Sequence, residues 1–181
     1  MPSAYLIHGT STKEDDWFPW LEEALAPTIT LHRLSLPHPF SPTPAAWDAA
    51  LDQQIPAEDK LTLITHSLGG ITALRYLGRH QVTGARLILV APFDQPLPLY
   101  PGLNSFLSPA PDYPALRAKL AAATVIVAKD DPIAPWQQGR RIAQQLDAKL
   151  ITKAHGGHFL TSDGFRQFPL VEREVRRLIN K

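Results

Sequence analysis

The sequence predicts an α/β fold in which a parallel, six-stranded sheet lies between two layers of helices. Short apolar segments alternate with longer amphipathic ones along the chain, as they do in repeated strand–helix–strand units. Several short segments, such as Leu87–Val90 and Val125–Val127, are apolar throughout, which is typical of strands covered on both faces. With 181 residues, 44% of them hydrophobic, the chain can bury a substantial core. We expect a single domain over residues 1–181, without a separate cap domain.

The expected strands are short and rich in leucine or β-branched residues. In chain order they cover Ala4–Ile7, Ile29–Leu34, Leu61–Thr65, Arg86–Ala91, Thr124–Ala128 and Lys149–Thr152. The expected helices repeat apolar residues every three or four positions. They cover Asp15–Ala26, Pro44–Gln54, Leu68–Leu77, Tyr113–Ala122, Trp136–Leu146 and Pro169–Asn180. The last helix shows the pattern most clearly, in Val171, Val175, Leu178 and Ile179.

Proline is unusually frequent, with 18 residues in the chain, against a usual share of about 5%. Four prolines lie in Pro37–Pro44 and seven in Pro92–Pro114, whereas the segments between them show regular periodicity. Such clusters are typical of stiff loops. We therefore expect two proline-rich loops that project from one domain.

The charge composition argues against a nucleic-acid or anionic-membrane partner. Lys and Arg number 18 against 17 for Asp and Glu, and no run of basic residues exceeds a pair such as Arg140-Arg141. The absence of cysteine excludes disulfides, thiolate-bound metals, Fe–S clusters and a cysteine nucleophile. The N-terminal segment lacks the basic region of a signal peptide, and no stretch approaches 18 apolar residues. We therefore expect a cytoplasmic protein.

Residues with catalytic chemistry follow the predicted strands, at the edge where parallel sheets bind their ligands. They occur in His8–Thr10, His66–Gly70, Asp94, Asp130–Pro132 and His155–His158. Candidates for a nucleophile, an acid and a base thus lie at one edge of the sheet.

Ser67 is the candidate nucleophile because it lies between a predicted strand and a predicted helix. This context is typical of the nucleophile elbow, a strained turn that exposes the serine hydroxyl above the sheet. Gly69 fits that turn because a side chain there would collide with the neighbouring strand. The helix N-terminus would also favour a developing anion. The alternative is a serine that only caps the helix.

A serine hydroxyl needs a positioned base, and the base needs an acid to orient it. In this architecture the chain order is serine, acid, histidine. Asp131 and His158 follow the fifth and sixth predicted strands in that order. Asp130 is the second candidate for the acid and Asp94 the third, and an Asp-Asp-Pro segment can also serve only to cap a turn.

We have three further expectations for the loop before His158 and for the other histidines near the site. The two glycines before His158 should give a flexible loop that brings the imidazole to the serine. His155 should be structural. His66 should point away from the site and pack against its neighbours.

Two backbone N–H groups, those of Thr10 and Leu68, are candidates for an oxyanion hole. A phosphate-binding loop is the competing interpretation of His8–Thr12, but no G-x-G-x-x-G or Walker pattern is present. No histidine spacing supports a metal site.

At these residues the chain resembles the small single-domain α/β-hydrolases of the retinoblastoma-binding protein 9 and bacterial YdeN type. The likeness runs the full length and includes, besides the motifs above, the segments Asp16–Leu21 and Leu36–Pro39 with Trp47. It implies a reduced α/β-hydrolase fold with sheet order 2-1-3-4-5-6, no cofactor, and Ser67, Asp131 and His158 as a catalytic triad. The retinoblastoma contact attributed to one relative uses a Leu-x-Cys-x-Glu motif, which this cysteine-free chain lacks, so that partner is not expected.

The predicted function is a serine hydrolase that cleaves small carboxylic esters through an acyl-enzyme, with no nucleic-acid, membrane or metal partner. The pocket should be walled by loops, chiefly residues 92–114. The candidate lining residues are Trp17, Phe93, Tyr100 and Trp136, although such aromatic residues can equally pack helices onto the sheet. Two alternatives stay open: a catalytically silent binding or regulatory protein of the same fold, and a perhydrolase or haloperoxidase-like activity of the same triad. No motif for a protein partner is evident.

Overall fold

Six parallel strands form one sheet in the computed structural model, which describes residues 1–180. They are β1 (Ser3–Ile7), β2 (Thr30–Arg33), β3 (Thr62–His66), β4 (Ala85–Val90), β5 (Leu120–Ala128) and β6 (Lys149–Lys153). Their spatial order, β2-β1-β3-β4-β5-β6, confirms the predicted order. β2 lies on one side of β1, and β3 to β6 follow one another on its other side, so the strand order reverses between β1 and β3. Ligand sites are expected at such a switch point, beyond the carboxyl ends of the strands.

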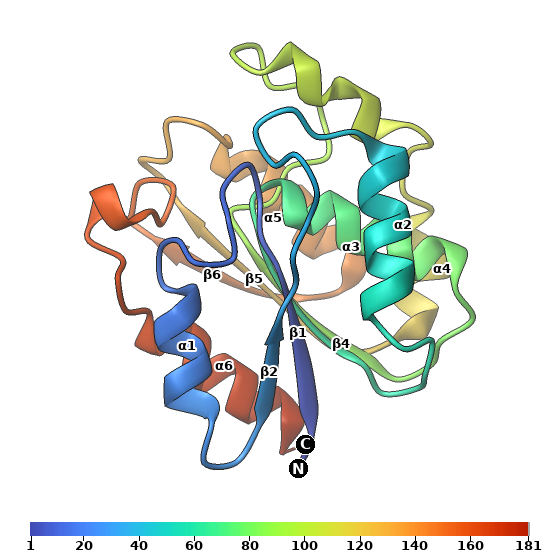
Figure 1. Ribbon diagram of the computed structural model, residues 1–181. Coiled ribbons are helices and arrows are strands. Elements are labelled where there is room, and N and C mark those ends of the chain that lie inside the picture. The colour runs from blue at the N-terminus through green and yellow to red at the C-terminus, as the bar shows by residue number, and fades with distance from the viewer. Residues whose placement is uncertain (181) are drawn as a thin grey trace.

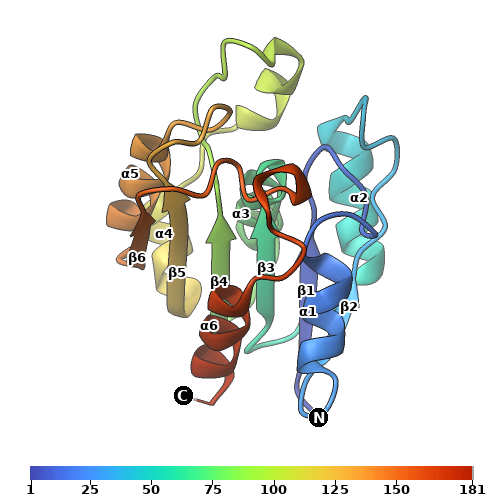
Figure 2. The same ribbon diagram turned by 90° about the vertical axis from the view of Figure 1, so that its left-hand side faces the viewer.

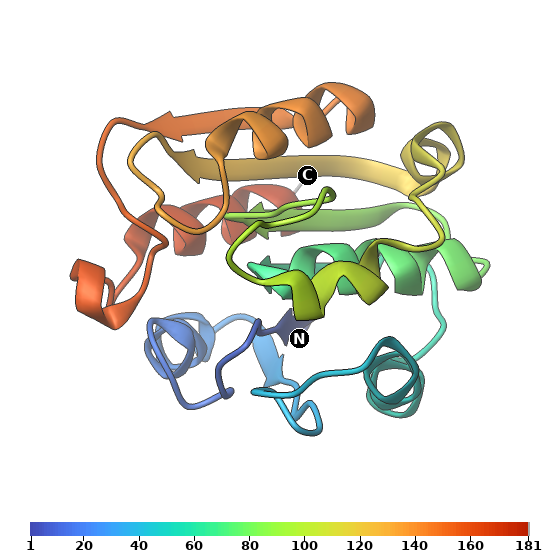
Figure 3. The same ribbon diagram turned by 90° about the horizontal axis from the view of Figure 1, so that it is seen from above.

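Helices cover both faces of the sheet (Figure 1, Figure 2). On one face lie α1 (Phe18–Leu25) and α6 (Pro169–Ile179); on the other lie α2 (Pro44–Gln54), α3 (Leu68–Arg79), α4 (Tyr113–Lys119) and α5 (Trp136–Leu146). Figure 3 shows α1 and α2 on opposite sides of the edge strand β2. Two short 3₁₀ helices, η1 (Pro101–Leu107) and η2 (Thr161–Asp163), lie in loops. Within residues 1–180, none of the helices has the length and apolar character needed to cross a bilayer.

Two apolar cores follow from the alternation of side chains along the central strands. In β3, Leu63 packs with the core under α2–α5, whereas Ile64 packs with the core under α1 and α6. Val125 and Ile126 of β5 divide between the two cores in the same way, and all four side chains are fully buried. Burial on both faces explains why consecutive residues within these strands, such as Leu63 and Ile64, are apolar.

The boundary between α4 and β5 differs from the sequence prediction. The helix expected to continue to Ala122 ends at Lys119, and β5 begins at Leu120, four residues before the predicted start. Leu120 pairs with Ala85 at the beginning of β4. The alanines at 121–123 favour helix intrinsically, but the neighbouring strand provides backbone partners that override this preference.

The first helix begins at Phe18 instead of the predicted Asp15. Asp16 has φ 53°, which is outside the right-handed helical region and breaks the periodic pattern before Trp17. Pro19 fits the first helical turn, where its missing N–H costs no hydrogen bond.

Candidate active site

Ser67 lies in the turn between β3 and α3, at the carboxyl edge of the sheet. Its backbone has φ 53° and ψ −122°, a conformation that residues with a side chain rarely adopt. The Ser67 N–H donates to the carbonyl oxygen of Val90 in β4 (2.9 Å), which ties the turn to the sheet. The strained turn therefore presents the hydroxyl at the N-terminus of α3, with 8% of the residue exposed.

Gly69 allows the turn to approach the neighbouring strand. A Cβ atom at Gly69 would lie 2.1 Å from the carbonyl oxygen of Ile7 and 2.9 Å from that of His8. Both oxygens belong to main chain at the end of β1, so no change of side-chain rotamer can relieve the overlap. The expected collision of a side chain at this position is confirmed.

Ser67, His158 and Asp131 form one chain of hydrogen bonds. Ser67 Oγ lies 2.9 Å from His158 Nε2, and His158 Nδ1 lies 2.8 Å from Asp131 Oδ2. The side chains of His158 and Asp131 are 4% and 2% exposed. A carboxylate beside Nδ1 favours a proton on that nitrogen, which leaves Nε2 free to accept the serine proton. The arrangement can thus activate the hydroxyl as a nucleophile.

The candidate acids differ in their contacts with the imidazole. Asp131 reaches His158 through Oδ2, while its Oδ1 accepts hydrogen bonds from two N–H groups of the following turn (2.8 and 3.0 Å). It therefore caps a turn and orients the base at the same time. Asp94 instead accepts from the Tyr113 hydroxyl (2.6 Å) and pairs with Arg141.

The loop that carries His158 is tied down, which corrects the expectation of a flexible loop. Asp130 Oδ1 accepts hydrogen bonds from the N–H groups of Gly156 and Gly157, both at 2.9 Å. These bonds, that of Gly157 above all, hold the pKa of Asp130 below its ordinary value. Asp163 Oδ2 accepts from the His158 N–H (3.0 Å). Gly157 has φ +55°, and a Cβ there would lie 2.5 Å from Asp163 Cγ. Glycine is therefore needed for the main chain at 157 to adopt this conformation and to lie this close to the Asp163 side chain.

His66 lies against His158, whereas the sequence interpretation had it pointing away. The two ring centroids are 5.0 Å apart, and His66 Nε2 donates to the carbonyl oxygen of His158 (2.8 Å). The ring is buried beside Trp17 and Phe18. Burial lowers the pKa of His66 to about 3, so the ring is neutral at physiological pH. His66 thus holds the main chain of His158 in place. In the sequence, the only sign of this role is the position of His66 next to Ser67.

We expect His66 to make the folded protein less stable in acid. Its folded-state pKa of about 3 lies below the unfolded value of about 6.5, so the unfolded chain takes up this proton first as the pH falls. The free energy of unfolding should therefore decrease from about pH 6.5 toward pH 3, by on the order of 2 kcal/mol from this group at about pH 5. Urea denaturation at about pH 7.5 and pH 5 measures the change.

His66→Gln is the matched variant for this measurement, because glutamine keeps an N–H donor but has no proton to gain in this range. It should lose less stability than the wild type between the two pH values. An equal loss in both proteins would show that His66 does not cause the acid sensitivity.

Thr10 and Leu68, whose N–H groups are the predicted oxyanion donors, belong to segments beside the serine. Thr10 follows β1 and lines the cavity over Ser67, and Leu68 is the first residue of α3. Gly9 brings the segment after β1 against the turn, since a Cβ there would lie 3.0 Å from Ser67 Cβ and 3.4 Å from Leu68 N. The segment that carries Thr10 and the turn that carries Leu68 thus lie against each other at the cavity over Ser67.

A cavity of about 110 Å³ opens over Ser67. Its walls combine the polar groups of the site with apolar side chains from the three loops after β4, β5 and β6. The lining residues are Thr10, Ser11, His66, Ser67, Leu97, Tyr100, Leu103, Ile133, His158 and Leu160. The segment 92–114 contributes three of these residues, as expected for the main wall.

The four aromatic residues proposed from the sequence as pocket lining have different places. Tyr100 lines the cavity. Trp17 and Phe93 are instead buried in the two cores, and Trp136 lies under the Lys129 ammonium, 5.7 Å from the ring centroid. Packing of helices and loops onto the sheet, the alternative interpretation of these residues, accounts for Trp17 and Phe93.

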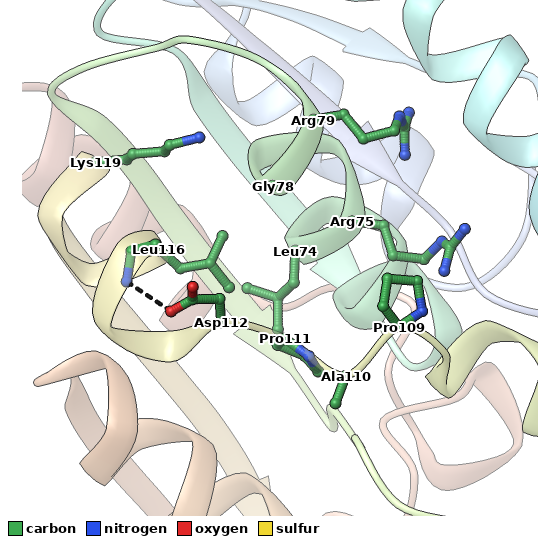
Figure 4. Close-up of a pocket in the computed structure, with 11 residues that line it drawn as sticks. Leu74, Arg75, Gly78, Arg79, Pro109, Ala110, Pro111, Asp112, Leu116 and Lys119 are labelled. Carbon is green, nitrogen blue, oxygen red and sulfur yellow. Dashed lines mark hydrogen bonds between the residues drawn. The ribbon is translucent and has the colours of Figure 1, made fainter.

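A second cavity of about 400 Å³ lies between α3 and α4 (Figure 4). Leu74 and Leu116 point into it. Two of the basic side chains that line it already have partners within the protein. Arg75 pairs with Asp48 (2.6 Å), and Lys119 donates to two carbonyl oxygens at the end of α3. Among residues 1–180, no group of three or more His, Cys, Asp or Glu side chains is placed to hold a metal ion. The candidate nucleophile Ser67 and the candidate base His158 line the cavity over Ser67 and not this second cavity.

The chain is similar to known hydrolases over nearly its whole length. A family model described as serine hydrolase matches residues 4–177. YdeN of Bacillus subtilis (strain 168) is 35% identical over 174 residues, which cover 92% of this chain and 90% of YdeN. The crystal structure of the ydeN gene product superposes with a TM-score of 0.94 at 32% identity, over 100% of both chains.

Two more distant proteins match this chain, one in sequence and one in structure. The serine hydrolase RBBP9 of Rattus norvegicus is 27% identical over 150 residues, covering 81% of this chain and 80% of that protein. Mouse alpha/beta hydrolase domain-containing protein 10 has a TM-score of 0.70 at 18% identity, over 99% of this chain and 90% of that one. These findings confirm the resemblance and the α/β-hydrolase fold that the sequence predicts.

Proposed function

This chain belongs to the serine hydrolase family and is a hydrolase, and from that premise we propose that it cleaves small carboxylic esters through an acyl-enzyme intermediate. Ser67 is the nucleophile, His158 the general base and acid, and Asp131 the group that orients the imidazole. The observation that carries the proposal is the unbroken hydrogen-bond chain from Ser67 Oγ through His158 to Asp131 Oδ2, at 2.9 and 2.8 Å.

In acylation, Ser67 Oγ attacks the carbonyl carbon of the ester while His158 Nε2 takes the serine proton. The carbonyl oxygen becomes an anion, which the N–H groups of Thr10 and Leu68 stabilise. His158 then gives its proton to the leaving oxygen, and the alcohol departs. In deacylation a water molecule loses a proton to the same nitrogen and attacks the acyl-enzyme. His158 then gives this proton to Ser67 Oγ as the acid is released, which restores the free enzyme. Asp131 stabilises the imidazolium in both steps.

A serine-directed fluorophosphonate tests the proposal, with p-nitrophenyl acetate turnover measured on the same sample. The probe reacts only with an activated serine, so it should label one peptide, the one that contains Ser67. Mass spectrometry of the digested protein locates the label. A folded protein that neither reacts with the probe nor hydrolyses the ester would reject the esterase and favour the catalytically silent binding protein.

Asp131→Asn should lower kcat for p-nitrophenyl acetate by about 10⁴-fold, because an amide no longer holds the imidazole in the required tautomer. Asp130→Asn is the matched control, since it makes the same change one residue earlier, at a carboxylate that contacts glycine N–H groups instead of the imidazole. It should cost far less activity. If Asp130→Asn proves the more damaging of the two, Asp131 is not the acid.

A further inference from the structure

We propose that the site takes esters with a bulky apolar acyl group, flat and aromatic or branched, and with a small leaving alcohol. This inference rests on the proposed ester hydrolysis at Ser67 and adds the substrate class to it. It is carried by two adjoining cavities whose walls differ.

The cavity over Ser67 adjoins a wider one. The inner cavity measures about 110 Å³ and the outer one about 450 Å³. Thr10, Tyr100 and Leu103 line both. The remaining walls of the outer cavity come from the proline-rich loop after β2 and from η1, which both lie above the carboxyl edge of the sheet in Figure 1. A group attached to the reacting carbon can therefore extend from Ser67 past Tyr100 into the outer cavity.

The chemistry decides which part of the ester takes that route. The oxyanion must point to the two backbone N–H donors, and the leaving oxygen must lie within hydrogen-bond reach of His158 Nε2. Ile133 and Leu160 line the inner cavity together with His158, and none of the three lines the outer cavity. The leaving alcohol is thus confined to the smaller space. The remaining substituent, the acyl group, is directed along Tyr100 and Leu103 into the larger one.

The rim of the outer cavity exposes apolar surface that such an acyl group would cover. Phe40 is 78% exposed and Tyr100 39%, although aromatic side chains of this size are usually buried. Removing this surface from water would favour binding of an apolar group. No Asp, Glu, Lys or Arg lines either cavity, so an ionised acyl group would find no counter-ion there. The site therefore favours an uncharged acyl group.

Two isomeric esters test the assignment, because they exchange the large and the small part of the substrate. Methyl phenylacetate has the bulky group on the acyl side, and benzyl acetate has it on the alcohol side. We expect kcat/KM for methyl phenylacetate to be about tenfold or more higher. Equal values, or a preference for benzyl acetate, would overturn the proposal.

Variants locate the preference. Phe40→Ala should lower the ratio of kcat/KM for methyl phenylacetate to that for benzyl acetate, by about tenfold if the ring forms one wall. Leu99→Ala is the matched control: Leu99 is 76% exposed and next to Tyr100, but it lines neither cavity, so the ratio should not change. An unchanged ratio in Phe40→Ala would contradict the proposed wall.

Different results would reject the substrate class and the serine hydrolase mechanism. If fluorophosphonate labels Ser67 but neither isomer is hydrolysed, the substrate class is wrong and the serine hydrolase mechanism stands. If the probe does not label the folded protein, the proposed function fails and the substrate class with it.

Discussion

Ser67→Ala should lower kcat for p-nitrophenyl acetate by about 10⁶-fold, close to complete loss of turnover. Alanine removes the attacking oxygen and leaves His158 and Asp131 with no group to activate. Any residual rate would come from the oxyanion donors and from substrate binding alone. Fluorophosphonate labelling should vanish together with turnover, because both need the same oxygen.

The same substitution should leave folding nearly unchanged. The Ser67 side chain is small and its hydroxyl bonds to His158, so its loss should change the free energy of unfolding by no more than about 1 kcal/mol. Urea denaturation of both proteins checks this. Turnover or labelling that persists in a folded Ser67→Ala variant would mean that another residue is the nucleophile.

Gly69→Val should prevent folding. The new Cβ would overlap the carbonyl oxygen of Ile7, which is 2.1 Å away, and Ile7 is itself paired with Thr65 in β3. Because the obstacle is the backbone of an inner strand, relief requires a shift of β1 or of the start of α3. Such a shift costs several kcal/mol, comparable with the roughly 5–15 kcal/mol that stabilises a typical domain.

Gly78→Ala is the matched control for Gly69→Val, since both glycines lie in α3. No heavy atom lies within 4 Å of a Cβ placed at Gly78, and the residue is exposed. Alanine should raise the free energy of unfolding by roughly 0.5–1 kcal/mol, because its helix propensity is higher than that of glycine. Circular dichroism and urea denaturation measure both variants. A folded and active Gly69→Val protein would rule out the turn geometry described for Ser67.

The kind and order of the secondary-structure elements could be predicted because they follow from local patterns. The segment Leu87–Val90 of β4 is apolar throughout because both of its faces are buried, and helices such as α6 show the spacing of a single buried face. The beginning of β5 could not be predicted in this way. Leu120 and the alanines after it favour a helix locally, and they become strand only because β4 supplies backbone partners.

The sequence by itself determined which reactive residues reach the carboxyl edge of the sheet, since parallel strands all end there and Ser67, Asp131 and His158 each follow one. Only the tertiary structure decided which of Asp130 and Asp131 contacts the imidazole of His158. The two carboxylates are adjacent and chemically identical, and the path of the turn sends one to glycine N–H groups and the other to the imidazole.

The contacts of His66 and Trp17 were likewise decided by tertiary structure. His66 donates to a carbonyl oxygen 92 positions away in the sequence, and Trp17 is buried in a core instead of lining the pocket. A local pattern encodes the period of an element and the chemistry of a turn. It does not encode which distant segment packs against a given side chain, because that depends on how all the elements close around the core together.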